Sequence, residues 1–123
     1  MAWLLREGEV LAAIDIASTR AARRRGLLGR DGIDGALLLR PARAVHTINM
    51  RFPIDVAYCA PWEPPLDGVA VHDVVASLTV LETVSMPRFR LGRPRLKASC
   101  VIEAEAGAFE RWGLRGGDRL EVR

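Results

Sequence analysis

The stretch VHTINMRFPIDVAYC, residues 45–59, carries the most distinctive residue pattern in the chain. It contains one of two histidines, one of three methionines and one of two cysteines. Side chains on a strand point alternately to opposite faces, so His46 and Met50 would share one face of a strand over 44–50. The apolar run 54–59 predicts a second strand, which would pair with the first through a turn at 51–53. We therefore expect a β-hairpin here, with His46 opposite or near Cys59.

Apolar runs of strand length continue on both sides of this stretch. Residues 10–16 alternate apolar and other side chains, which is typical of a half-buried strand. Turn residues such as glycine and proline separate this run from the others. The sequence predicts further strands at 36–39, 69–75, 77–84, 100–106 and 119–123.

Two short helices are expected between these strands. The segment 17–32 can begin a helix at Ser18 or Thr19, since a hydroxyl oxygen there accepts a hydrogen bond from a free backbone N–H. Gly26 or Gly29 can end it. A second helical turn is predicted at 107–113. About seven strands with closely spaced turns favour antiparallel pairing, and we expect a mainly β antiparallel sandwich or partly open barrel with one or two short helices.

Length and composition indicate one ordinary globular domain. The 123 residues are 50% hydrophobic and 27% charged, and we expect a single domain over residues 1–123. No apolar run approaches the roughly 18 residues that span a bilayer, and charged residues at positions 6, 7 and 9 interrupt any signal-peptide core. We expect a cytoplasmic protein with no membrane association, in which Cys59 and Cys100 are reduced, buried thiols.

The basic residues give only weak support for nucleic-acid binding. The net charge is +3, and Lys97 is the one lysine among 18 basic residues. The arginines of residues 20–30 do not form one stripe on a helix, and no aromatic residues interleave with them as in RNA-binding motifs. The stretch 87–97 is a stronger basic segment, and weak binding of an anionic polymer there remains an alternative.

Three blocks of the sequence resemble a known family. They are RRRGLLGR at 23–30, VHTINMRFPIDV at 45–56, and VIEAEAG at 101–107 leading into GLRGGDRLEV at 113–122. Together they resemble the domain-of-unknown-function family 192, a group of small, mainly β prokaryotic proteins. The resemblance covers roughly residues 12–122 and implies a fold and candidate positions. It implies no activity, cofactor or catalytic residue.

An enzyme or a metal-binding protein would use the polar residues of the middle block. His46, Asp55 and Cys59 would form its site if the hairpin brought them together. A metal site usually needs three or four protein ligands, and His72 is the only other histidine. We therefore predict no metal and no cofactor.

A structural role for the buried acids is the preferred interpretation. A buried carboxylate needs a partner, and a guanidinium matches it with two hydrogen bonds. We expect Arg23 or Arg30 to pair with Asp55 or Glu103 and so to hold the helix against the sheet.

The sequence as a whole favours a binding or interaction module over an enzyme. Its pocket would lie between the 45–55 hairpin and the helix block, and its partner would be a small ligand or a protein. The sequence indicates neither the ligand nor the oligomeric state. The candidate binding residues are His46, Met50, Asp55, Arg23, Arg30 and Glu103.

Overall fold

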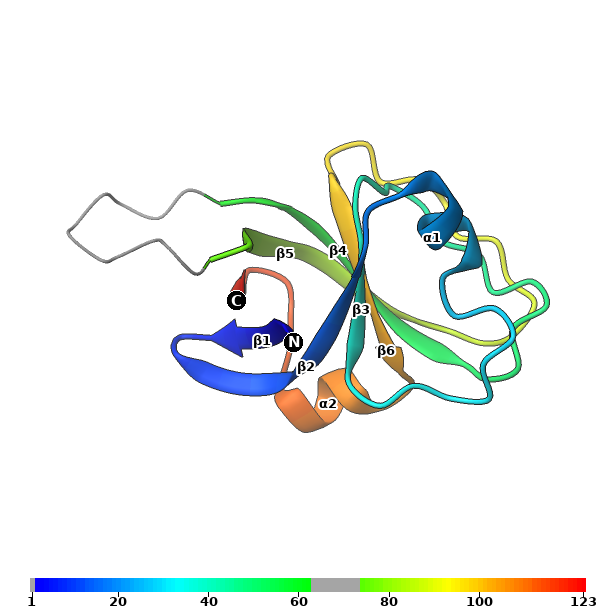
Figure 1. Cartoon of the computed structure of the whole chain (residues 1–123), viewed down its shortest axis with the longest axis horizontal. Coiled ribbons are helices and arrows are strands. Elements are labelled where there is room, and N and C mark those ends of the chain that lie inside the picture. Colours follow the sequence, from blue (N-terminus) through cyan, green and yellow to red (C-terminus); the bar gives the residue numbers. More distant parts are fainter. Residues whose placement is uncertain (1, 63–73) are drawn as a thin grey trace.

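The computed structural model describes residues 2–62 and 74–123. Within these ranges seven strands form a closed barrel with the order β1-β2-β3-β6-β4-β5-β7 (Figure 1). The expected mainly β class with two short helices is confirmed. The strands are β1 (Ala2–Arg6), β2 (Glu9–Ala17), β3 (Ala36–Leu39), β4 (Ile54–Pro61), β5 (Ala76–Met86), β6 (Cys100–Glu105) and β7 (Arg119–Val122), and the helices are α1 (Arg20–Arg25) and α2 (Ala108–Trp112).

The strand pairing departs from the expected antiparallel pattern at one place. β2 and β3 are parallel, with Ile14 opposite Ala36, whereas the other pairs of the barrel are antiparallel. The connection between β2 and β3 carries α1, and it is long enough for the crossover that a parallel pair requires. The prediction of antiparallel pairing was therefore wrong for β2 and β3.

Strand β1 was also not predicted from the sequence. β1 pairs with β2 around a tight turn in which Glu7 and Gly8 have positive φ angles of 51° and 80°. The charged residues that interrupt the N-terminal apolar run thus lie at and beside this turn. The strand expected over 69–75 falls largely outside the described residues, as does His72, and residues 74 and 75 are not in a strand.

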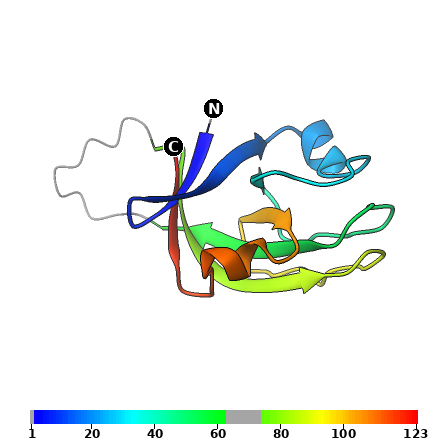
Figure 2. The same cartoon turned by 90° about the horizontal axis from the view of Figure 1, so that it is seen from below.

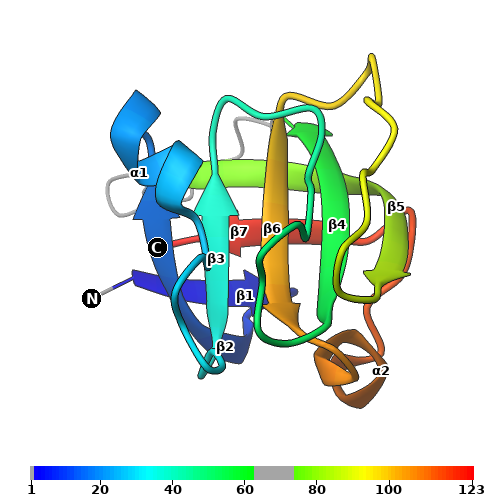
Figure 3. The ribbon, with the colours of Figure 1, turned by 90° about the vertical axis from the view of Figure 1, so that its right-hand side faces the viewer.

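The sheet has a hydrophobic core on each side. Along β4, Ala57 and Cys59 face the barrel interior and belong to the inner core, whereas Val56 and Tyr58 face outward into an outer core. A strand that is buried on both faces has apolar side chains on both, so its sequence does not alternate between apolar and polar residues. This explains the continuous apolar runs of β3 and β4. The outer core lies beneath α1 and the segments 42–53 and 87–98, which cross the face of β3, β6 and β4 in Figure 3.

The two ends of the barrel differ. Helix α2 lies across the end where β6 finishes, as Figures 1 and 2 show, and its Phe109 packs into the inner core. Gly113 ends this helix in the left-handed conformation, with a φ of 63°, so the expected terminator is confirmed. The opposite end, called the barrel mouth below, is bordered by the ends of β2, β3 and β4 and the beginnings of β5 and β6 (Figure 3).

Candidate functional site

The segment expected to form the first strand of the hairpin is a loop. Residues 44–50 contain a single bridge, between His46 and Leu91, and β4 pairs with β5 and β6 instead. Thr47 takes the place of a strand ladder, because its hydroxyl donates to the carbonyl of Pro87 at 2.6 Å and accepts from the N–H of Arg90 at 2.8 Å. The hairpin prediction was wrong because residues 45–47 bond to residues 87–92 instead of β4, through backbone groups as well as the Thr47 hydroxyl.

Four of the six candidate binding residues line one small cavity, called here the flank cavity. It lies on the outer face of the sheet, between the α1 region and residues 44–50, and has a volume of about 70 Å³. This is the place where the sequence predicted a pocket, although the space is small. The four residues are Arg23, His46, Met50 and Glu103.

Glu103 is the unusual member of this cavity. Its side chain is buried, with 4% of the residue exposed, and no described residue donates a hydrogen bond or an ion pair to its carboxylate. Burial raises the pKa of this carboxyl group to about 7, because the charged form loses its hydration in the protein interior. Glu103 therefore holds a proton at pH values where an exposed glutamate has released it.

Asp55 lies on the other side of the sheet and has partners that the sequence did not suggest. Its Oδ1 accepts a hydrogen bond from the Ser85 hydroxyl at 2.7 Å. Its Oδ2 accepts from the backbone N–H groups of Gly107 and Phe109 at 3.0 and 3.1 Å. Asp55 thus accepts hydrogen bonds from free N–H groups at the beginning of α2. In most helices the side chain of the N-cap residue accepts these bonds, but the N-cap of α2 is Gly107, which has no side chain.

The predicted arginine partners are elsewhere. Nη1 of Arg23 donates to the carbonyls of Ser18 and Arg40, at 2.7 and 3.4 Å, and Arg30 lines a separate groove beside β2. Neither arginine pairs with Asp55 or Glu103, so the expected ion pair between helix and sheet was wrong. Backbone N–H groups stabilise the Asp55 carboxylate. At Glu103 no guanidinium pairs with the carboxyl group, and the raised pKa favours its protonated form, which costs less free energy to bury than the charged form.

The structure does not bring the alternative catalytic set together. His46 is on the outer face, whereas Asp55 and Cys59 are on the inner face of β4, four residues or about 13 Å apart along the strand. In the described parts of the chain, no three His, Cys, Asp or Glu side chains are grouped closely enough to hold a metal ion.

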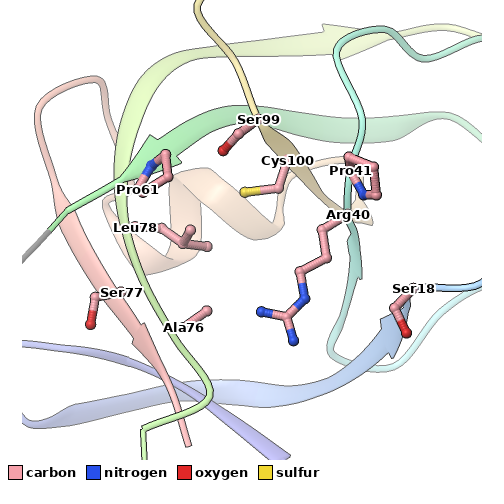
Figure 4. A pocket seen from close by; sticks show the side chains of 9 residues that line it. All are labelled: Ser18, Arg40, Pro41, Pro61, Ala76, Ser77, Leu78, Ser99 and Cys100. Atoms are coloured by element: carbon pink, nitrogen blue, oxygen red, sulfur yellow. The ribbon is translucent and has the colours of Figure 1, made fainter.

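A second cavity lies at the barrel mouth and is called here the mouth cavity. Its volume is about 570 Å³. Figure 4 shows the guanidinium of Arg40 extending into it from the end of β3, and the Sγ atom of Cys100 pointing into it from β6. Three serine hydroxyls and several apolar side chains complete the wall: the other lining residues are Ser18, Pro41, Pro61, Ala76, Ser77, Leu78 and Ser99.

Sequence reasoning missed this cavity. Its residues come from five strand ends, and none of them belongs to the family-like blocks. The one local signal was Arg40, a charged residue directly after the buried apolar run of β3. Such a position at the end of a buried strand places a charge beside an opening of the barrel.

The basic stretch 87–97 is irregular, as expected, and is partly engaged with the rest of the protein. Arg95 forms an ion pair with Glu82 at 2.9 Å and stacks on the Tyr58 ring at 4.4 Å. Nε of Arg88 donates to the carbonyl of Met50. Figure 3 shows this stretch and α1 at opposite sides of the outer face, with residues 42–53 between them. Anionic-polymer binding through 87–97 stays a prediction.

Comparisons with known proteins agree with this fold. A protein of unknown function from Novosphingobium aromaticivorans DSM 12444 has a similar structure, with a TM-score of 0.70 and 18% identity over 98% of this chain and 82% of that one. A Sinorhizobium meliloti 1021 protein described as a "putative transcription regulator" has a TM-score of 0.63 and 20% identity, over 98% of this chain and 91% of that one. At such identities the likeness shows the fold alone.

The remaining comparisons concern the sequence. No curated protein matches this chain. None of the helices in residues 2–62 and 74–123 has the length and apolar character needed to cross a bilayer. The family model of DUF192, described as "Uncharacterized ACR, COG1430", matches residues 3–122. The match spans nearly the whole barrel and confirms the resemblance found in the three sequence blocks, so the chain belongs to the DUF192 family.

Proposed function

We propose that this protein is a binding module, not an enzyme, and that it holds a small anionic molecule in the mouth cavity. The observation that supports this most directly is the Arg40 guanidinium, which extends into the cavity (Figure 4). Among the described residues no carboxylate forms an ion pair with Arg40, and its side chain makes one hydrogen bond, to the carbonyl of Val75 at 3.3 Å. A guanidinium has five N–H donors, so most of them are available to a ligand.

The size and lining of the mouth cavity suit a small molecule. Ligand sites usually have volumes of about 300–1,000 Å³, are largely apolar, contain a few polar groups, and often occupy the mouths of β-barrels. The mouth cavity has about 570 Å³ and one guanidinium. A carboxylate or a phosphate is the expected partner, because both accept two parallel hydrogen bonds from arginine.

The hydroxyl groups and the apolar side chains would have different roles. Ser18, Ser77 and Ser99 offer donors and acceptors at the rim, whereas Pro41 and Leu78 provide rigid or apolar wall. We therefore expect a ligand with one anionic end and a short apolar or hydroxylated body.

The flank cavity is the weaker choice for this ligand. A volume of about 70 Å³ accommodates a few water molecules, far less than the usual range for organic ligands. The candidate residues around the flank cavity then have a structural role beside the outer core. Arg40, which was not among the predicted binding residues, becomes the proposed ligand-binding residue.

We also infer a cytoplasmic, prokaryotic protein. The two similar structures named above come from bacteria, and the free thiols of Cys59 and Cys100 suit a reducing compartment.

The proposal can be tested by thermal unfolding in the presence of simple anions. Succinate and inorganic phosphate are the probes, and succinamide is the neutral counterpart of succinate. A ligand that binds only the folded state adds about 2.7 kcal/mol of stability at one hundred times its dissociation constant. We expect an anion to raise the melting temperature of the wild-type chain by several degrees, and succinamide to leave it unchanged.

Two arginine variants separate site binding from general charge effects. Arg40→Gln should abolish the anion-dependent shift. Arg43→Gln is the matched control, because Arg43 is exposed and does not line the mouth cavity, so its shift should equal that of the wild type. Equal shifts in all three proteins, or no shift with any anion, would refute the proposal.

A further inference from the structure

The two cysteines of the chain lie side by side inside the barrel. Cys59 on β4 and Cys100 on β6 are direct partners in an antiparallel pair, and both are free and buried. Directly opposed residues in such pairs have Cα atoms about 4.5–5.5 Å apart, which falls within the 4.4–6.8 Å that disulfide bonds span. Both side chains belong to the inner core and therefore point to the same side of the sheet.

The two thiols differ in access. Cys100 lines the mouth cavity, whereas Cys59 does not. Only 3% of Cys100 is exposed, but its Sγ atom points into the cavity in Figure 4. A reagent that enters the barrel mouth therefore meets Cys100 first, and Cys59 lies beside Cys100 on the neighbouring strand.

The surroundings also make Cys100 the better nucleophile. The neighbouring Cys59 thiol, together with Ser99 and the positive charge of Arg40, lowers the pKa of Cys100 against the opposing effect of burial. The neighbouring Cys100 thiol and burial raise the pKa of Cys59. The thiolate is the reactive form of cysteine, so attack by Cys100 should come first.

We propose that Cys100 and Cys59 form a dithiol pair that reacts with small carboxylate-bearing disulfides entering the mouth cavity. Arg40 would hold the carboxylate beside Cys100, and this preference for an anionic reagent rests on the function proposed above. The exchange itself depends only on the adjacent thiols and the opening. The product is a Cys59–Cys100 disulfide across two neighbouring strands.

The reaction balances in two exchange steps. The Cys100 thiolate attacks one sulfur of the disulfide RSSR, so a Cys100–S–S–R bond forms and RS⁻ leaves. Cys59 then gives up its proton and attacks Sγ of Cys100, which forms the intramolecular disulfide and releases the second RS⁻. In sum, two protein thiols are oxidised and one RSSR is reduced to two RSH.

The test measures the mass of the intact folded chain during incubation with three disulfides of different charge. These are 3,3′-dithiodipropionate, which is anionic, 2-hydroxyethyl disulfide, which is neutral, and cystamine, which is cationic. The wild-type chain should become lighter by two hydrogen atoms, and peptide mapping should find Cys59 linked to Cys100. We expect the anionic reagent to react about tenfold faster than the neutral one, as one screened charge pair allows.

Cysteine variants identify the order of the steps. Cys59→Ala should accumulate the mixed disulfide on Cys100, because the resolving thiol is gone. Cys100→Ala should leave Cys59 unmodified as long as the chain is folded, and circular dichroism verifies folding of both variants. Arg40→Gln should reduce the ratio of the anionic to the neutral rate, whereas Arg43→Gln should preserve it.

The possible failures can be told apart. Wild-type thiols that stay reduced in the folded chain but react in denaturant would overturn the dithiol proposal, whatever anions do to the melting temperature. A mixed disulfide on Cys100 that never resolves in the wild type would overturn it too. Closure of the disulfide with no preference for the anionic reagent would support the dithiol pair, and would contradict the anion-binding role of Arg40.

Discussion

Asp55 and Phe109 are 54 residues apart in the sequence, yet Oδ2 of Asp55 accepts a hydrogen bond from the backbone N–H of Phe109 at 3.1 Å. The same oxygen accepts from Gly107. This carboxylate therefore joins the beginning of β4 to the first turn of α2, the helix that lies across one end of the barrel. The negative charge also lies at the favourable end of the peptide dipoles of the helix.

Asp55→Ala should destabilise the protein by about 2–4 kcal/mol, because it leaves buried N–H groups and the Ser85 hydroxyl without their acceptor. Urea unfolding measures the change in the free energy of unfolding. Asp31→Ala is the matched control, since the Asp31 side chain is 88% exposed in its ion pair with Arg51 and should matter by less than about 0.5 kcal/mol. Equal effects of the two substitutions would contradict the capping role of Asp55.

His46 and Thr47 are neighbours with opposite expected effects. His46 is exposed and Thr47 is fully buried. His46→Ala should change the free energy of unfolding, measured in urea, by less than about 0.5 kcal/mol. Thr47→Val keeps the side-chain shape but removes the bonds to Pro87 and Arg90, so it should cost about 1–3 kcal/mol. A larger loss for His46→Ala than for Thr47→Val would show that the imidazole, and not the hydroxyl, holds the loop.

Glu103 should make the stability of the protein depend on pH. Its pKa in the folded chain is about 7, above its value of about 4.3 in an unfolded chain. The folded state therefore retains a proton that the unfolded state has released, and stability should fall as the pH rises from about 4.5 to 7 and then level off. The upper bound of this loss is about 3–4 kcal/mol at 1.36 kcal/mol per pKa unit.

Glu103→Gln should remove this contribution, so that the variant gains stability relative to the wild type above pH 7. Denaturant unfolding from pH 4.5 to pH 8 measures the difference. Glu105→Gln is the matched control on the same strand, because Glu105 is exposed, and its pH profile should follow that of the wild type. A Glu103→Gln profile parallel to the wild type would mean that the buried carboxyl group titrates normally.

Gly92 lies where the two outer segments meet. Its N–H donates to the carbonyl of Val45 at 2.8 Å, and a Cβ atom there would be 2.6 Å from that same oxygen and 3.1 Å from the Tyr58 hydroxyl. Gly92→Ala should therefore push the segments apart and cost about 1–3 kcal/mol in urea unfolding. At Gly32 a Cβ atom meets no neighbour within 4 Å, so Gly32→Ala should be neutral or slightly stabilising. Similar values for both would exclude close packing at Gly92.

The local sequence pattern predicted most of the secondary structure. The runs 36–39, 54–59, 77–84 and 100–106 form β3, β4, β5 and β6 with small differences at their ends, because strand-length apolar runs and intervening turn residues act over a few neighbours. The helix cap at Thr19 and the terminator Gly26 are equally local, and both are confirmed. The same reasoning failed for 44–50, where alternating side chains suggested a strand and the hydroxyl of Thr47 stabilises a loop.

The sequence by itself thus determined most of the elements, the mainly β class and the family, all of which depend on short patterns. Only the tertiary structure decided which distant residues contact one another. Closure of the barrel brings Asp55 to the N–H groups of α2, sets Cys59 opposite Cys100, and gathers Arg40 with four other strand ends around one opening. These contacts join residues that are tens of positions apart, and no local pattern specifies such pairs, since each side chain could satisfy its hydrogen bonds or charge with several distant partners.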